Sequence, residues 1–455
     1  MNGHHHHHGT SQHSSSATAA LDEAYTQAFE SAQPDEGRTV VRYSLVAQEV
    51  DWEFVPGQTT RAWTFGGQVP GPTIEAQVGD VLEIRVINRL PEPTVVHWHG
   101  LRIPAVMDGT DRVQNPIAPG GSFTYRFRVP DAGTFWYHSH FNETVQLERG
   151  LYGALIVRAA DEPVFDADRV FVLDDVALEQ DGVIKRPGGW IESHDGREGN
   201  IRLVNGTQEP EVRMSEGHIE RWRFVNAASA RYVRLSVGGR PFRIIGTGGG
   251  LISSPFTANE VLLAPANRTE IVVGPFAEGD ALRIETLPFD RGSFKSHKKA
   301  ELFATVRVGA AAPSMARTPE RLRTIEPLTT GPVTPNRVVR LGFGLGMTHG
   351  VEFNINHEQH HDDTPVRVGE LQVWDVVNRS PVHHPFHLHG YFFQVLEVNG
   401  KAPAYLAWDD TVDVPPFGSV RLAWLPDDRP GGWMYHCHIL EHHAAGMMAH
   451  FDVIR

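Results

Sequence analysis

Residues 79–88 read Gly-Asp-Val-Leu-Glu-Ile-Arg-Val-Ile-Asn, a run in which apolar and polar residues alternate between a Gly-Asp turn and a terminal Asn. Alternation with a period of two predicts a β-strand that buries one face. A second strand of this kind is predicted at 123–129, and residues 217–226 and 369–378 repeat the Gly-to-Asn arrangement of 79–88. We therefore expect the same strand once in each of three related domains.

The composition agrees with an all-β fold made of Greek-key β-sandwich or barrel domains. The 455 residues include 44 Gly and 31 Pro, which suit many tight turns between short strands. Helix is expected to be minor, at Leu21 to Ser31. Breaks in composition predict a tag and N-terminal extension at 1–36, a first domain at 37–160, a second at 161–310, a linker at 311–335 and a third domain at 336–455.

Charge and hydropathy argue against two classes of partner. Acidic residues outnumber basic ones by 55 to 41, for a formal net charge of -14, so nucleic acid is not an expected partner. No run approaches the roughly 18 apolar residues of a membrane-spanning helix, so membrane insertion is not expected either. The five-histidine run His4 to His8 is interpreted as part of a purification tag that extends to about Ser16.

Histidines carry the chemistry of this chain. The middle segment has only isolated histidines, at His194, His218 and His297. The outer domains hold four short clusters, which are His97-Trp-His99, His138-Ser-His140, His384-Pro-Phe-His387-Leu-His389 and His436-Cys-His438-Ile-Leu-Glu-His442-His443. On a strand, a His-x-His pair places both imidazoles on one face about 7 Å apart, near enough to bind one metal ion or two neighbouring ions. A single pair is more often a surface or hydrogen-bonded core feature, but four pairs together favour metal binding.

The last cluster offers a thiolate, an imidazole and a thioether at Cys437, His442 and Met447. With a second imidazole, for which we choose His384, these residues form the ligand set of a blue copper site. The alternative is that Cys437, the single cysteine, is a small buried residue and that Met447 fills the core.

Strand geometry adds an electron route to this site. Residues at odd and even positions point to opposite faces of a strand, so His436 and His438 face away from Cys437. The thiolate and its two adjacent imidazoles would therefore connect a blue copper to a separate copper site, and electrons would cross one at a time.

The order and spacing of the four clusters across 37–455 resemble the copper-binding motifs of the multicopper oxidases, and most closely those of bacterial three-domain laccases. The resemblance implies cupredoxin-like domains and four copper ions per chain. It places the type 1 copper on His384, Cys437, His442 and Met447, and the type 2 copper on His97 and His387. It places the binuclear type 3 pair on His99, His138, His140, His389, His436 and His438.

The same resemblance implies an activity. The trinuclear cluster would lie between the first and third domains, with the middle domain as a spacer, and would reduce dioxygen to water. Electrons would come from small aromatic or phenolic reductants or mediators, because a methionine axial ligand is associated with low to middling potentials. We expect a monomer that is periplasmic or secreted, from which a native signal peptide has been removed.

Two further residues concern protons. Asp108 matches the acidic residue that family members place near the type 2 copper, and we interpret it as a proton relay; a turn-forming Asp-Gly is the alternative. Bacterial relatives commonly carry an acid directly after the type 1 histidine, whereas this chain has His443 there. That departure puts the usual proton route in doubt, although a histidine could itself relay protons.

Alternative interpretations concern one further segment and the function of the chain. The His-rich run from His349 to Asp363 is interpreted as a solvated loop, and the alternatives are an extra metal site or part of the donor-binding surface. A metallo-oxidase that acts on Cu(I), Fe(II) or Mn(II) is the nearest competing function, although only 8 Met are present, without a Met-rich insert. A copper-carrying or structural protein and a two-domain nitrite reductase are less favoured, because all twelve ligand positions are filled.

Overall fold

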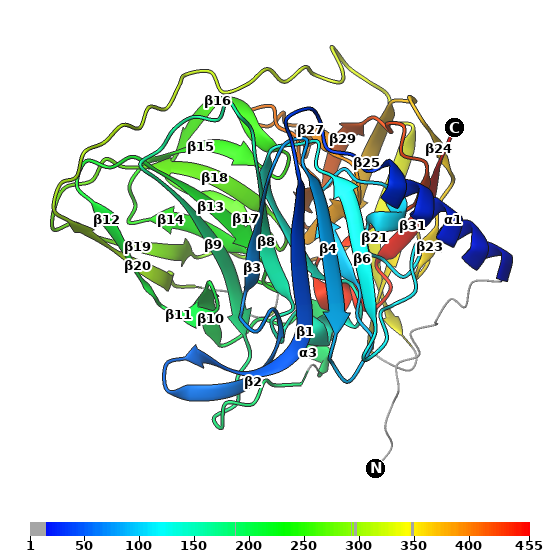
Figure 1. Ribbon diagram of the computed structural model, residues 1–455, viewed down its shortest axis with the longest axis horizontal. Coiled ribbons are helices and arrows are strands. Elements are labelled where there is room, and N and C mark those ends of the chain that lie inside the picture. The colour runs from blue at the N-terminus through cyan, green and yellow to red at the C-terminus, as the bar shows by residue number, and fades with distance from the viewer. Residues whose placement is uncertain (1–14, 187, 293, 295–297, 347–349) are drawn as a thin grey trace.

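The computed structural model describes residues 15–186, 188–292, 294, 298–346 and 350–455. The predicted tag at His4 to His8, together with His297 and His349, lies outside these ranges. In the described residues the strands form six sheets, and Figure 1 shows them grouped in pairs along the chain. The predicted all-β, three-domain fold is therefore confirmed.

The first domain contains β1 (Val40–Val55), β2 (Gln58–Phe65), β3 (Gly71–Gln77), β4 (Val81–Asn88), β5 (Val96–His99), β6 (Ser122–Arg128), β7 (Gly133–Ser139) and β8 (Tyr152–Arg158). One sheet has the order β2-β1-β4-β6 and the other β3-β8-β7-β5. The second sheet carries the histidines, because β5 and β7 are antiparallel neighbours that pair His97 with His138.

The second domain contains β9 (Ala167–Val176), β10 (Ile201–Val204), β11 (Thr207–Gln208), β12 (Glu211–Ser215), β13 (Glu220–Asn226), β14 (Val233–Val237), β15 (Phe242–Thr247), β16 (Gly250–Ala258), β17 (Val261–Leu263), β18 (Arg268–Val273), β19 (Ala281–Leu287) and β20 (Glu301–Gly309). Its sheets have the orders β11-β10-β9-β13-β18-β15-β16 and β12-β20-β19-β14-β17.

The third domain contains β21 (Arg337–Gly346), β22 (Gly350–Ile355), β23 (His361–Asp362), β24 (Val366–Arg367), β25 (Gln372–Asn378), β26 (His384–Leu388), β27 (Phe393–Val398), β28 (Thr411–Val414), β29 (Ser419–Trp424), β30 (Gly431–Cys437) and β31 (Met448–Ile454). Its sheets have the orders β22-β21-β25-β29-β27 and β23-β31-β30-β26-β28, with β24 also paired to β31. The antiparallel pairing of β26 with β30 sets His387 opposite His436.

The repeated Gly-to-Asn segment forms the same strand in each domain. These strands are β4, β13 and β25, and each runs parallel to the first strand of its domain, which is β1, β9 or β21. Each of these strands ends in an asparagine whose side-chain amide donates hydrogen bonds to backbone carbonyls outside that strand. The three asparagines are Asn88, Asn226 and Asn378. The alternation within the segment buries one face, as Leu82, Ile84 and Val86 show. Each such side chain contributes roughly 1.5–3 kcal/mol of apolar burial.

Helices are short and lie mostly at the domain boundaries. They are α1 (Ser15–Ser31), the 3-10 turn η1 (Ala105–Met107), α2 (Glu143–Gln146), α3 (Trp190–Asp195) and α4 (Leu440–Ala444). Helix α1 begins before the predicted Leu21 and includes two residues assigned to the tag, because the alanine-rich start favours helix and Tyr25 packs on Phe123 at 5.1 Å. No helix in the described part of the chain is both long enough and apolar enough to span a bilayer.

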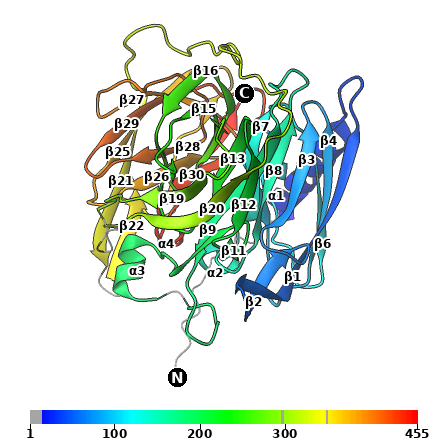
Figure 2. The same cartoon turned by 90° about the vertical axis from the view of Figure 1, so that its left-hand side faces the viewer.

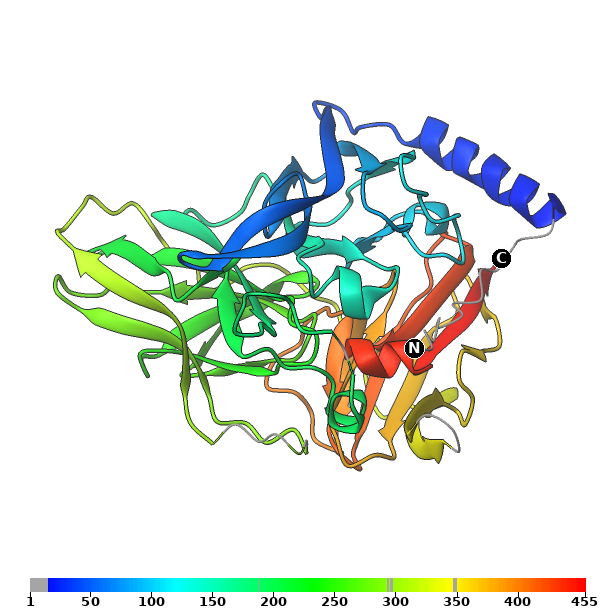
Figure 3. The same cartoon turned by 90° about the horizontal axis from the view of Figure 1, so that it is seen from below.

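The three domains meet around a common centre. Figure 3 shows the blue-to-cyan first domain, the green second domain and the orange-to-red third domain each beside the other two. The segment between β20 and β21 returns along the outside of the second domain, where Asp166 accepts hydrogen bonds from Ser314, Met315 and Ala316. Farther on, the N–H of Leu328 donates to Gln394 of the third domain. This crossing lets the third domain return to pack against the first.

Candidate metal centre

Three residues from separate segments of the third domain form one buried ligand set. His384 begins β26, Cys437 ends β30 and His442 lies in α4. The Cys437 Sγ atom is 3.4 Å from His384 Nδ1 and 3.6 Å from His442 Nδ1, and the two nitrogens are 3.1 Å apart. All three side chains are fully buried. The structure therefore brings together the thiol and both imidazoles that the sequence assigned to a blue copper.

Met447 lies beside this set in the same hydrophobic core. The N–H of Cys437 donates to the Met447 carbonyl at 3.1 Å, and the N–H of Met447 donates to the His442 carbonyl at 3.0 Å. The loop after α4 is thus folded back onto the end of β30, which brings the main chain of Met447 to that of Cys437.

The protonation states of this set suit a copper ion. Burial raises the pKa of the Cys437 thiol, lowers that of His384 to about 3 and holds that of His442 well below its usual value. The imidazoles are therefore neutral, with lone pairs available, and the thiol ionises only when a cation stabilises the thiolate. His384 Nε2 is hydrogen-bonded to Ser380 Oγ at 2.7 Å, and His442 Nε2 donates to the His194 carbonyl at 2.9 Å. These bonds fix both rings with Nδ1 toward the sulfur.

Eight further histidines surround a second centre between the first and third domains. Within each of three groups the ligand atoms lie within 4.8 Å of one another. The groups are His97, His99 and His387; His99, His138 and His438; and His140, His389 and His436. Every one of these side chains is buried. The geometry accommodates the type 2 and type 3 assignment drawn from the resemblance, which stays a prediction for each residue.

The ring nitrogens at this centre divide into outer and inner atoms. In all but His438, one nitrogen of each ring bonds a carbonyl or carboxylate outside the cluster. Among the described residues, the inner nitrogens of His97, His99, His138, His140 and His387 and both nitrogens of His438 have no hydrogen-bond partner. Buried polar atoms without partners are costly, whereas metal ions would satisfy them. The eight residues thus fit a copper cluster.

Asp108 holds two of these histidines from the end of η1. Its Oδ2 accepts a hydrogen bond from His389 Nδ1 at 2.8 Å, and its carbonyl accepts one from His97 Nδ1 at 2.8 Å. Burial raises the pKa of Asp108 to about 7. Gly109 follows at φ +83°, where a Cβ would lie 1.7 Å from the Val96 carbonyl oxygen. Asp108 is therefore both the first residue of an Asp-Gly turn and a hydrogen-bond partner of two histidines.

Asp410 is a second buried acid that contacts histidines of the cluster, and it was not predicted from the sequence. His99 Nε2 donates to its Oδ1 at 3.1 Å, and His387 Nδ1 donates to its carbonyl at 2.9 Å. Burial alone would raise the pKa of Asp410, but the guanidinium of Arg268 holds it well below its usual value. Arg268 lies on β18 and pairs with both carboxylate oxygens. The middle domain, expected only as a spacer, thus orients histidines of the cluster through Arg268.

Glu143 is the third acid, and it explains the unusual His443. Its Oε1 forms an ion-pair contact with His140 Nδ1 at 2.9 Å, and its Oε2 accepts a hydrogen bond from His443 Nδ1 at 2.7 Å. The ring of His443 stacks on His436 at 4.2 Å. Burial alone would raise the pKa of Glu143, but these two histidines hold it well below its usual value. The first domain therefore supplies, at the start of α2, a carboxylate beside the position where relatives carry their acid.

Four residues near the two centres were not predicted from the sequence, and they differ in whether the sequence held a signal for them. They are Glu143, Asp410, Arg268 and His194. Glu143 follows His140 by three positions, so the spacing was a usable signal. Arg268 and His194 lie far in sequence from Asp410 and His442, which they contact, and only the packing of the domains brings these pairs together. Asp410 contacts His387 within the third domain and His99 across the domain boundary. The interpretation of His349 to Asp363 as a solvated loop is correct for the exposed turn at 357–360 and wrong for the strands on either side of it. Residues 350–355 form β22, which pairs with β21, and 361–362 form β23.

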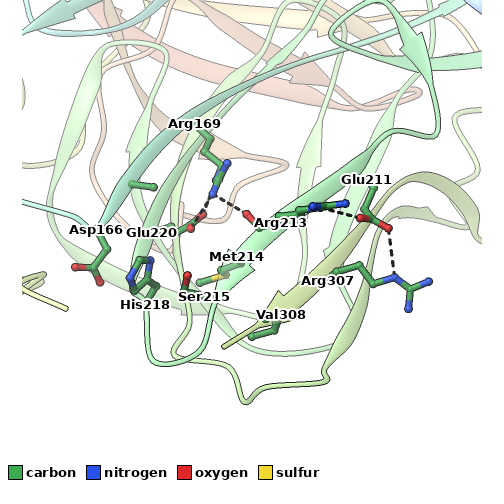
Figure 4. Close-up of a pocket in the computed structure, with 12 residues that line it drawn as sticks. Asp166, Arg169, Glu211, Arg213, Met214, Ser215, His218, Glu220, Arg307 and Val308 are labelled. Carbon is green, nitrogen blue, oxygen red and sulfur yellow. Dashed lines mark hydrogen bonds and ion pairs between the residues drawn. The ribbon is translucent and has the colours of Figure 1, made fainter. Parts of the chain in front are cut away.

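A surface hollow lies away from both centres. It is a cavity of about 690 Å³ at one end of the second domain, shown in Figure 4. Its arginines are already paired, Arg169 with Glu220 at 2.6 Å and Arg213 and Arg307 with Glu211 at 3.2 and 3.5 Å. It shares no lining residue with the histidine clusters among the described residues, so it is not part of the metal centre.

Comparison with known proteins agrees with the geometry of both centres. Residues 46–162, 134–280 and 332–455 match three family models, each described as multicopper oxidase. The multicopper oxidase MmcO of Mycobacterium tuberculosis is 33% identical over 482 residues, which cover 96% of this chain and 90% of that protein.

Solved structures show the same fold. The multicopper oxidase from Campylobacter jejuni, described as a metallo-oxidase, matches with a TM-score of 0.81 at 30% identity and covers 91% of both chains. The laccase from Pediococcus acidilactici matches with a TM-score of 0.80 at 28% identity, covering 93% of this chain and 92% of that one.

The variant Glu143→Gln tests the link between α2 and the cluster. An amide accepts a weaker hydrogen bond than a carboxylate, so His140 is held less firmly, and we expect copper affinity to fall about 10- to 100-fold. Copper retention against a chelator series measures this. The control is Glu92→Gln, which removes an acid bound to Asn142 and Gln146 near the same helix but away from the histidines. Unchanged retention in Glu143→Gln would contradict the assigned role.

Proposed function

The chain belongs to the multicopper oxidase family, and from this premise we propose that it is a laccase-type oxidoreductase. It would oxidise phenolic and other aromatic donors one electron at a time at a type 1 copper, and reduce dioxygen to water at a three-copper cluster. Multicopper oxidases as a family use dioxygen and reduce it. The observation that carries the proposal is that Cys437 belongs to one centre while its neighbours His436 and His438 belong to the other.

When bound, copper ions supply the one-electron redox chemistry that these side chains lack. The protein chain itself connects the two centres. Cys437 lies with His384 and His442, while its two neighbours lie with the histidines of the first domain. His436 also donates from Nδ1 to the Cys437 carbonyl at 2.9 Å, which shortens the path through the main chain. An electron that enters at the thiolate is therefore a few covalent bonds from the second centre.

Burial of both centres supports the proposal, since water-free surroundings keep the imidazoles neutral and limit side reactions. The second centre takes ligands from the first and third domains. The second domain contacts both centres, through Arg268 beside Asp410 and through the His194 carbonyl beside His442. We expect four coppers per chain, with Met447 as the axial ligand of the type 1 ion. A monomeric state and a periplasmic or secreted location stay predictions.

A metallo-oxidase is the second candidate, because the Campylobacter jejuni enzyme that this chain resembles is described as one. Against it, the chain has only 8 Met, whereas soft thioether ligands suit Cu(I). We therefore favour aromatic donors.

Donor preference decides between the two candidates. We expect kcat/KM for a dimethoxyphenol to exceed that for Cu(I), Fe(II) and Mn(II) by at least about tenfold, measured by oxygen consumption with copper-loaded protein. The opposite order would make the metallo-oxidase the correct assignment. No oxygen consumption with any donor would contradict both.

Asp108 is proposed to deliver protons to the cluster, because it touches two of its histidines and has a pKa of about 7. Below that pH it carries a proton to give, and above it the proton is lost. We expect turnover to fall as pH rises through about 7, and the variant Asp108→Asn to lower the maximum and remove this fall. Glu148→Gln is the control, since Glu148 has a similar pKa but bonds Ala177 and Ser229 instead. Full turnover of Asp108→Asn at every pH would exclude the relay.

A further inference from the structure

The type 1 ligand His442 is closed to direct contact with a donor. Its side chain is fully buried, Phe353 stacks on its ring at 3.8 Å, and its Nε2 donates to the carbonyl of His194 at 2.9 Å. The route from the surface to His442 therefore runs through α3, which belongs to the second domain. Figure 2 shows α3 beside β22, and the two elements are in contact.

The outer side of α3 is an exposed aromatic surface. The ring of His194 is in contact with Trp190 at 5.5 Å, with Phe294 at 4.9 Å and with Phe343 at 6.0 Å. Trp190 and Phe294 also contact each other at 5.2 Å. The fractional exposures of Trp190, Phe294 and Phe343 are 48%, 63% and 38%. We call these three exposed residues, together with the buried ring of His194 that contacts all of them, the aromatic platform. A contiguous exposed group of this kind marks a binding surface more often than scattered apolar residues do.

The charges around the platform favour an uncharged aromatic ligand over a metal ion. Asp195 is buried, and it accepts hydrogen bonds from His194 Nδ1 at 2.8 Å and from the N–H of Phe294 at 2.9 Å. Glu192 pairs with Lys185 at 2.6 Å. Both carboxylates of α3 are thus engaged within the protein, while the rings facing outward present flat π surfaces, which attract other rings by stacking.

We propose that the aromatic platform binds the planar aromatic reductant, and that the electron reaches His442 through the main-chain carbonyl of His194. This inference rests on the laccase-type function proposed above and names the donor site for it. A phenol held there gives one electron to the copper bound by Cys437, His384 and His442, which is reduced, and releases its hydroxyl proton to the surrounding water. The phenoxyl radical that results leaves the exposed platform.

The variant Trp190→Ala tests the platform without touching a metal ligand. Because stacking between aromatic rings changes affinity by about two- to tenfold, we expect the KM for 2,6-dimethoxyphenol to rise about fivefold with kcat nearly unchanged. The double variant with Phe294→Ala should raise it further, and Trp190→Phe should restore most of the affinity. Hexacyanoferrate(II), a donor with no ring to stack, should be oxidised within about twofold of the wild-type rate by all of them.

The control is Phe256→Ala, which removes an aromatic side chain of 36% exposure from β16 of the same domain. It should leave the KM for dimethoxyphenol unchanged. An unchanged KM in the double variant would overturn the proposal, as would an equal loss of rate with both donors, which would indicate damage to the copper site.

A binding measurement separates failure of the platform from failure of the proposed function. Saturation-transfer NMR with 4-nitroanisole, a planar ring that the enzyme does not oxidise, is recorded on the reduced holoenzyme under argon. We expect transfer to the wild-type protein and its loss in the double variant. If wild-type protein oxidises no phenol yet binds this ring through Trp190 and Phe294, the laccase assignment fails while the binding site stands. If it oxidises phenols and the double variant binds the ring as the wild type does, the platform is refuted.

Discussion

His436, Cys437 and His438 stand at the end of β30, where the alternation of side chains along a strand sends the thiol to one side and the imidazoles to the other. The two ligand sets therefore lie on opposite sides of one segment of the chain. The strand cannot slip by one residue without exchanging the two faces, because the whole hydrophobic pattern of β30 would invert with it. Its pairing with β26 and β31 fixes that register, and thereby the distance over which electrons travel.

The second centre depends in turn on how the domains meet. Its histidines come from the first and third domains, so neither domain can form it alone. Buried imidazoles without partners oppose that association until metal ions satisfy them, whereas Asp108, Asp410 and Glu143 favour it by bonding histidines across or within the domains. Copper binding and domain docking are therefore coupled. The middle domain takes part in this through Arg268, whose charge is matched by Asp410.

The sequence predicted the features that depend on local pattern. The alternating segment at 79–88 and its two repeats specified the β-fold and the number of domains, and the His-x-His pairs specified which strands face the centres. It did not reveal contacts that link residues far apart in the chain, such as Arg268 with Asp410, or His194 with His442, because no spacing relates them. Glu143 had a local signal, but its partner His443 came from another domain. Helix α1 begins before the predicted Leu21 because Ala17, Ala19 and Ala20 favour helix, and its later turns pack on the first domain.

Copper content and the visible spectrum, recorded on one copper-loaded sample, test the arrangement of the two centres most directly. We predict about four copper ions per chain, an intense thiolate-to-copper absorption band and a type 3 shoulder. In the variant Cys437→Ser the intense band should vanish, while about three coppers and the shoulder persist. A fully loaded wild-type protein that lacked the intense band would contradict the role of Cys437 and the electron route through β30.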